Sequence, residues 1–274
     1  MPQILDDTVR RLDAARVISD ETRTKLAALR DELTHGDLRA LVDDDDDGVD
    51  ESVRSIAAID SWSSACAPHV GRSWLDIPWY FAESYFYRRV LEATGFFRRP
   101  SAMFAVDPFA PIKREEEATA FPKVRALVDK PAPLDVLLHR SLWGNRADLS
   151  YTAGLAHGAA GDADDLLVDD TVRAVDVVGR AQRVAILLDN AGTELANDLV
   201  LANALRATVF AKSHPFFVSD ATVDDVARTA SALGLAHPTT IAHPYMTSAG
   251  FLFVDTMPSD LVEALRAFDV VIVK

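Results

Sequence analysis

The stretch of sequence that decides the fold is Ala185-Ile-Leu-Leu-Asp-Asn-Ala-Gly-Thr-Glu-Leu-Ala-Asn-Asp198. Its apolar run stops abruptly at Asp189 and Asn190, a short turn follows, and the remaining residues have the pattern of an amphipathic helix. In open α/β sheets, ligands bind at the carboxyl ends of strands, where the chain turns into the next helix. Packing alone gives a buried strand little reason to end in an acid and an amide, so these side chains are candidates for a metal or phosphate site.

Strands and helices alternate along the second half of the chain, whereas the first half is mostly helical. The expected strands are 184–188, 208–212, 251–254 and 269–273, and the expected helices between them are 193–205, 222–233 and 259–267. This alternation is typical of a parallel sheet with helices on its faces. We therefore predict an α/β protein with a helical N-terminal region at residues 1–135. A three-layer α/β/α, Rossmann-like domain with a mostly parallel sheet follows at residues 136–274.

The composition is that of a globular protein and argues against several functional classes. The chain has 274 residues, of which 49% are hydrophobic, so it can bury a sizeable core. Its net charge of -14 argues against a nucleic-acid or anionic-membrane surface, because both need clustered Lys and Arg. No apolar run approaches the roughly 18 residues of a membrane span. One cysteine, Cys66, and no signal-peptide pattern make the cytoplasm the expected compartment.

Asp220 and Lys212 are possible partners of the Asp189 and Asn190 pair. If the strands before these residues are neighbours, all four side chains lie at the same edge of the sheet. Two carboxylates and an amide oxygen suit Mg²⁺ or Mn²⁺, and a nearby lysine suits a phosphate. The alternative reading is structural, with Asp220 as a helix N-cap and Asn190 as a turn former.

Two further segments carry polar residues that need an explanation. Glu83 lies in a densely aromatic segment, where a carboxylate needs a partner or a purpose. Arg88 or Arg89 is a possible ion-pair partner for it. Asn145 and Asp148 lie in a polar, turn-like stretch between two apolar runs, which we interpret as a loop.

Four segments, in this order along the chain, carry a family resemblance. They are Pro78-Trp-Tyr-Phe-Ala-Glu-Ser-Tyr-Phe-Tyr-Arg-Arg89, Leu142-Trp-Gly-Asn-Arg-Ala-Asp-Leu-Ser150, Leu188-Asp-Asn-Ala-Gly-Thr-Glu-Leu-Ala-Asn-Asp-Leu199 and Pro215-Phe-Phe-Val-Ser-Asp220. Together they resemble the damage-control phosphatase family, in the acidic-residue methyltransferase-like branch that has a helical N-terminal domain. The similarity runs from about residue 74 to residue 274, and the order of the four motifs makes it specific.

The resemblance implies metal-dependent hydrolysis of phosphate monoesters, including sugar phosphates such as fructose 1-phosphate. It implies that Asp189, Asn190 and Asp220 are catalytic and hold a divalent metal ion, with Mn²⁺, Mg²⁺, Co²⁺ and Ni²⁺ as candidates. The expected partner is a small phosphorylated metabolite. The residues that the matching motifs assign to the substrate are Glu83, Asn145, Asp148, Glu194 and Lys212.

The resemblance leaves two alternatives open. Some members are described as carboxyl methyltransferases that use S-adenosylmethionine, and Glu194 and Asp220 would then contact that cofactor. Relatives also continue beyond the strand matched by residues 268–274 into an Arg-Thr-x-Lys motif that binds phosphate, and these 274 residues do not contain it. We therefore expect an α/β domain that is incomplete at its C-terminus, so that either the chain is shortened and its activity impaired, or a second polypeptide supplies this segment. A non-catalytic metal-binding remnant is the remaining alternative.

Overall fold

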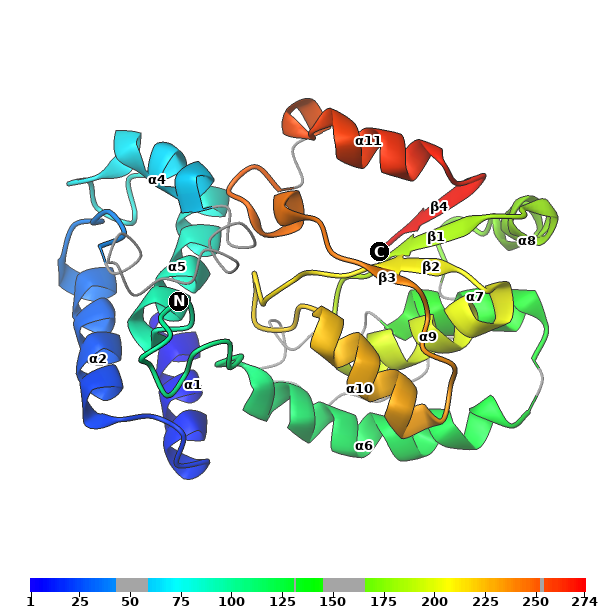
Figure 1. The fold of residues 1–274 in the computed structure, drawn as a ribbon, viewed down its shortest axis with the longest axis horizontal. Coiled ribbons are helices and arrows are strands. Elements are labelled where there is room, and N and C mark those ends of the chain that lie inside the picture. The colour runs from blue at the N-terminus through cyan, green and yellow to red at the C-terminus, as the bar shows by residue number, and fades with distance from the viewer. Residues whose placement is uncertain (43–58, 131, 145–165, 252–253) are drawn as a thin grey trace. The chain divides into compact units, whose positions relative to one another are not determined.

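A computed structural model describes residues 1–42, 59–130, 132–144, 166–251 and 254–274 (Figure 1). Contacts divide the chain into two compact units, each assembled from separate stretches of chain. The first unit contains Met1–Ile112, His214–Val218 and Pro244–Met257. The second contains Lys113–Ser213, Ser219–His243 and Pro258–Lys274.

Helix α6 (Ala110–Val128) belongs to the second unit from residue 113 onward, whereas the sequence places it before the predicted boundary at residue 135. The reason is packing, because Val124 of this helix lies in one apolar cluster with Ala196 and Leu233 of the α/β unit. Composition does not reveal which core a helix packs against, so this assignment requires the structure.

The first unit is built around helix α5 (Trp79–Thr94). Tyr85, Phe86 and Tyr87 of this helix are almost completely buried, and Trp62 packs between Tyr85 and Phe216. The helices of this unit are α1 (Pro2–Ala14), α2 (Asp20–His35), α4 (Ile59–Cys66), η1 (Ala67–His69), α5 (Trp79–Thr94), η4 (Pro244–Thr247) and η5 (Val254–Thr256).

The second unit contains a four-stranded sheet, in which every described strand pair is parallel. Its strands are β1 (Val184–Leu187), β2 (Thr208–Phe210), β3 (Thr240–Ile241) and β4 (Val270–Val273), in the order β3-β2-β1-β4. Ala185 of β1 lies opposite Thr208 of β2 and Val271 of β4. The predicted α/β class with a parallel sheet is confirmed.

The third strand is not where the sequence predicts it. It is the two-residue β3, and within the expected stretch 251–254 residues 252–253 lie outside the described part of the chain. The aromatic ring of Phe251 instead packs against Phe216 and Tyr245 in the first unit. The apolar residue at position 251 is therefore explained by packing in the core of the first unit, and not by a strand of the sheet.

Helices lie on both faces of the sheet (Figure 1). Helix α11 (Ser259–Arg266) lies on one face, and α7 (Leu134–Gly144), α9 (Gly192–Leu205) and α10 (Val223–Leu233) lie on the other. Ile186 and Val209 of the strands and Leu195 and Leu199 of α9 belong to one buried apolar cluster. None of the helices in the described part of the chain is both long and apolar enough to cross a bilayer. The helices of this unit besides α6 are α7 (Leu134–Gly144), α8 (Thr171–Arg180), α9 (Gly192–Leu205), α10 (Val223–Leu233) and α11 (Ser259–Arg266).

Candidate functional site

The candidate site lies where the chain leaves the carboxyl ends of β1 and β2. In the order β3-β2-β1-β4, the chain runs outward from β1 to β3 and then returns to place β4 on the other side of β1. Such a reversal is where open α/β sheets bind ligands. Asp189 and Asn190 follow β1, Lys212 follows β2, and Asp220 precedes α10.

The backbone joins the two loops that carry the acidic residues. The amide of Ala221 donates to the Asp189 carbonyl at 2.7 Å, and the amide of Ala191 donates to the Ser219 carbonyl at 2.6 Å. Asn190 and Asp220 form an isolated antiparallel bridge between the same loops. These bonds hold the Asp189 loop against the Asp220 loop.

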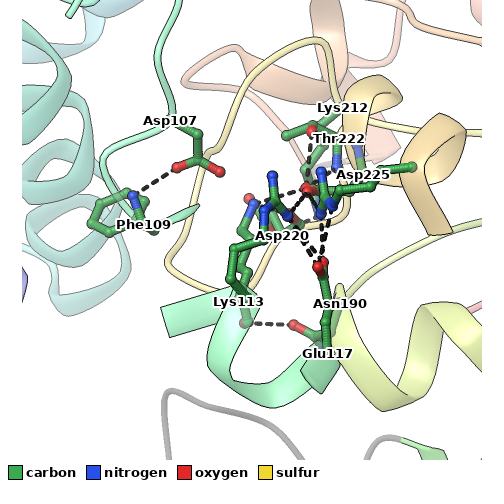
Figure 2. Close-up of polar contacts among 12 residues, drawn as sticks. Asp107, Phe109, Lys113, Glu117, Asn190, Lys212, Asp220, Thr222 and Asp225 are labelled. Carbon is green, nitrogen blue, oxygen red and sulfur yellow. Dashed lines mark hydrogen bonds and ion pairs between the residues drawn. The ribbon is translucent and has the colours of Figure 1, made fainter. Parts of the chain in front are cut away.

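Lys212 binds both carboxylates. Its Nζ lies 2.8 Å from Asp220 Oδ1 and 3.3 Å from Asp189 Oδ1, and Figure 2 labels Lys212 and Asp220 within the same cluster of polar side chains. The side chains of Lys212 and Asp220 are buried, whereas that of Asp189 is 41% exposed. Burial alone would lower the pKa of Lys212, but the charges of Asp220 and Asp189 outweigh it and raise the pKa. The lysine is therefore a permanent cation between two carboxylates.

Asn190 links this pair to Glu194. Its Nδ2 donates to Asp189 Oδ2 at 3.1 Å and to Glu194 Oε2 at 3.0 Å, and its Oδ1 accepts a hydrogen bond of 2.6 Å from the Ser219 hydroxyl. Burial, followed by the charge of Asp198, raises the pKa of Glu194 to about 7. The two carboxylates, the amide and the lysine thus form one polar network that includes Glu194.

The oxygen donors of this network suit a hard divalent cation. Asp189 and Asp220 have carboxylate oxygens and Asn190 has an amide oxygen, and Mg²⁺ and Mn²⁺ prefer ligands of these kinds. In this structure the amide oxygen of Asn190 faces Ser219, and its nitrogen faces Asp189. The Lys212 ammonium already occupies a cation position between the two carboxylates. Across the described ranges, no group of three or more His, Cys, Asp or Glu side chains is placed to hold a metal ion. Any metal here would therefore rely on the amide and on water or substrate oxygens.

Asp220 does not cap the helix that follows it. The N-cap of α10 is Thr222, whose hydroxyl accepts from the amide of Asp225, while the Asp225 carboxylate accepts from the amide of Thr222. This capping box leaves the Asp220 carboxylate to bind Lys212. The N-cap alternative for Asp220 is therefore wrong, and its carboxylate pairs with Lys212 instead.

The other residues that the motifs assign to the substrate are Glu83, Asn145 and Asp148. Asn145 and Asp148 lie outside the described residues. Glu83 lies on α5 in the first unit. Of its expected partners, Arg89 binds Glu32 at 2.7 Å and Glu92 at 2.8 Å, and the Arg88 guanidinium lies over the ring of Phe97. The roles of Glu83, Asn145 and Asp148 stay predictions.

Sequence reasoning missed several residues that support the site. Ser219 was visible in the Val-Ser-Asp motif, but its contact with Asn190 was not. Lys113 is completely buried, and its Nζ donates to the Asp220 carbonyl at 2.6 Å and to Asp225 Oδ2 at 2.9 Å. Asp198, on the same helix as Glu194, binds the Ser141 hydroxyl. A Lys on one helix gives no sequence signal that its partner lies about a hundred residues away.

Comparisons with known proteins show which proteins this chain resembles. The chain is 30% identical to damage-control phosphatase ARMT1 of Danio rerio, a match that covers 65% of this chain and 47% of the relative. The ARMT1 of Xenopus tropicalis is 31% identical over 65% of this chain and 48% of its own length, and that of Homo sapiens is 28% identical over 56% and 43%. The chain thus spans about half the length of the curated relatives it matches.

A crystal structure of a DUF89 family protein from Pyrococcus horikoshii has the same fold. The match has a TM-score of 0.52 at 19% identity and covers 93% of this chain and 82% of that one. The model of the damage-control phosphatase ARMT1-like domain matches residues 1–274, the full length of the sequence. The chain therefore belongs to the damage-control phosphatase ARMT1-like domain family.

Proposed function

We propose that this protein is a metal-dependent phosphatase that hydrolyses phosphate monoesters of sugars or related small metabolites. The observation that carries the proposal is the convergence of the Asp189 and Asp220 carboxylates on one buried cation, Lys212, at the carboxyl edge of a parallel sheet. Membership of a phosphatase family supports the reaction class. No feature of the described residues favours the methyl-transfer alternative. The single cysteine favours the cytoplasm as the compartment of action.

Asp189, Asn190 and Asp220 would hold the metal ion, for which Mn²⁺, Mg²⁺, Co²⁺ and Ni²⁺ are the candidates. A divalent cation bound there neutralises charge on the phosphoryl oxygens. Asp189 is the exposed member of the set, so the substrate would approach from its side. Asp220 is buried and hydrogen-bonded, so its role is to fix one side of the site.

Overall, hydrolysis bonds a water oxygen to phosphorus, breaks the bond between phosphorus and the sugar oxygen, and moves one water proton to that sugar oxygen. If Asp189 positions the attacking water, this occurs in one displacement. If Asp189 is the nucleophile, its carboxylate oxygen first bonds to phosphorus and releases the sugar, and water then breaks the phosphorus–carboxylate bond. Lys212 carries a positive charge that stabilises the phosphoryl oxygens. Glu194 accepts a hydrogen bond from the side-chain nitrogen of Asn190 and thereby helps to fix the orientation of this amide.

The test is hydrolysis of p-nitrophenyl phosphate and fructose 1-phosphate by the purified chain, with each of the four metals added in turn. The expected result is metal-dependent turnover that Asp189→Asn abolishes. Asp224→Asn is the matched control, because Asp224 is an exposed residue in the first turn of α10 and its change removes the same charge. Turnover by Asp189→Asn at the wild-type rate would show that the site is assigned wrongly.

The same assay tests the proposal that a second polypeptide supplies phosphate-binding residues. Among the described strands, β4 pairs only with β1, and its residues Val270–Val273 are all apolar. An apolar edge strand of this kind can accept a strand from another chain. Saturable turnover by the purified chain alone would exclude an obligatory partner. If instead Mn²⁺ binds without turnover, the proposal of a second polypeptide is supported.

A further inference from the structure

Helix α6 contacts the loop that carries Asp220 and the first turn of α9, which follows the loop that carries Asp189 and Asn190. Lys113 and Glu116 lie three residues apart on this helix, a spacing that places them on one face. Lys113 binds the loop that contains Asp220, and Glu116 binds the start of α9, directly after the loop that contains Asp189 and Asn190. A single rigid element therefore contacts both sides of the site.

The contact made by Lys113 is fully buried. Figure 2 shows Lys113 extending towards Asp220 and Asp225. Its Nζ donates to the Asp220 backbone carbonyl at 2.6 Å, and it forms an ion pair with the Asp225 carboxylate at 2.9 Å. Because Asp225 also closes the capping box with Thr222, Lys113 ties the Asp220 backbone to the first turn of α10. A buried ammonium costs free energy unless its partners are well placed, so this geometry is specific.

The contact made by Glu116 fixes the other loop. Its Oε1 accepts a hydrogen bond from the Thr193 amide at 2.8 Å, in the first turn of α9, where a negative charge is favoured. Gly192 precedes this residue with φ of +71°, and a Cβ there would overlap the Glu116 carboxylate. The close approach therefore needs glycine at position 192, two residues after Asn190.

We infer that Lys113 and Glu116 are positioning residues that set the distance between the two ligand loops. Neither side chain is needed to touch the metal or the substrate. Lys113 acts through the backbone of Asp220, and Glu116 acts through the start of α9. The expected effect on metal binding rests on the proposed function. The positioning of the two loops by α6 does not depend on a metal.

The first experiment measures Mn²⁺ binding to Lys113→Met and Glu116→Ala by electron paramagnetic resonance. Residues that hold metal ligands in place typically change metal affinity by about 10-fold to 100-fold when they are replaced. We expect each variant to raise the Kd for Mn²⁺ at least tenfold. If Lys113→Met fails to fold, Glu116→Ala carries the test, because Glu116 is only partly buried.

The matched control is Glu117→Gln. Glu117 lies on the same helix, is buried, and binds Arg114 and Arg228, but no described contact joins it to the backbone of either ligand loop. This variant should retain the Mn²⁺ affinity of the wild type within about threefold, since it is two or more contacts away from the ligands. An equal loss of affinity in Glu117→Gln and Lys113→Met would overturn the inference.

The second experiment uses the metal-free protein, so it separates the inference from the proposed function. Amide hydrogen exchange at Ala191 and Ala221 reports the two bonds that join the loops. Lys113→Met and Glu116→Ala should raise these exchange rates at least tenfold, and Glu117→Gln should not. If the wild type binds no Mn²⁺ and the rates still rise, the proposed function fails and the positioning role stands. Unchanged rates in both variants would exclude the positioning role.

Discussion

The Ser219 hydroxyl donates a hydrogen bond of 2.6 Å to the side-chain oxygen of Asn190. The amide nitrogen of Asn190 donates to Asp189 and Glu194 at the same time. These three bonds fix which end of the amide faces each neighbour, because exchange of the oxygen and nitrogen would place donors against Ser219 and acceptors against two carboxylates. The orientation of this amide is therefore determined by its partners.

Ser219→Ala removes the donor that orients the Asn190 oxygen. We expect the Kd for Mn²⁺ to rise about tenfold, as is typical when a partner of a metal ligand is lost. Isothermal titration with Mn²⁺ measures the change. Ser231→Ala is the control, because Ser231 is exposed and its hydroxyl donates to the Ala227 carbonyl of its own helix. Equal affinities of the two variants would show that Ser219 does not orient Asn190.

Lys212→Met removes the cation between the two carboxylates. Because Asp220 is buried, its charge would lose its partner, and breaking a buried pair in this way typically costs about 3–5 kcal/mol. We expect a loss of this order in the free energy of unfolding of the metal-free protein, measured with urea. Mn²⁺ should raise the Tm of this variant more than that of the wild type, because the metal replaces the missing positive charge.

The control for this prediction is Lys25→Met. Lys25 forms an ion pair with the exposed Glu21 on α2, and an exposed pair of this kind contributes little to stability. Its loss should change the free energy of unfolding only slightly, with or without Mn²⁺. A Lys212→Met variant that is as stable as Lys25→Met would contradict the buried pair.

His214 makes the stability of the first unit depend on pH. Burial, together with the nearby charge of Arg88, lowers the pKa of His214 from 6.5 to about 3. Below about pH 6.5 the unfolded chain therefore binds a proton that the folded chain does not. This residue alone should lower the free energy of unfolding by up to about 1.4 kcal/mol for each pH unit between these two pKa values.

Urea unfolding at pH 7, 6, 5 and 4 tests this prediction, with His214→Gln compared with the wild type. The variant should lose less stability on acidification than the wild type, because its side chain does not titrate. His237→Gln is the control, since His237 is exposed on the surface. An identical pH dependence of the wild type and His214→Gln would show that His214 does not resist protonation in the folded protein.

Sequence patterns predicted the centre of the α/β unit but not its periphery. The apolar run that becomes β1 ends beside Asp189, and both this strand and the helix after it were predicted within a residue or two of their bounds. The helix is buried on most of its surface, so the expected amphipathic pattern is weak. The strand Thr240–Ile241 is too short to show a period and was missed. The run at Phe251 is apolar because it packs in the other unit. The local sequence pattern predicts that a residue is buried, but it does not predict in which of the two cores.

The candidate site likewise has residues that the sequence predicted and residues that it did not. Asp189, Asn190 and Asp220 were predicted as one site because each follows a strand or precedes a helix. Their supporting contacts were not predictable, since Lys113 reaches Asp220 across more than a hundred residues of sequence. A charged residue inside a helix gives no local sign of its partner, and only the tertiary structure shows that Lys113 is buried.

Gly144 allows α7 to lie close to α9 at the position of Glu194. A Cβ at residue 144 would lie 2.8 Å from Glu194 Cα, a backbone atom that a side-chain rotation cannot move away. Gly144→Ala should therefore lower the free energy of unfolding by about 1–3 kcal/mol, the usual cost of overpacking.

Gly179→Ala is the control on α8, where a Cβ meets nothing within 4 Å, and it should raise the free energy of unfolding by up to about 1 kcal/mol. Urea unfolding of both variants measures the difference, and because Glu194 also binds Asn190, the Gly144→Ala protein should bind Mn²⁺ more weakly as well. A Gly144→Ala protein as stable as the wild type would show that the two helices can separate at this point without cost.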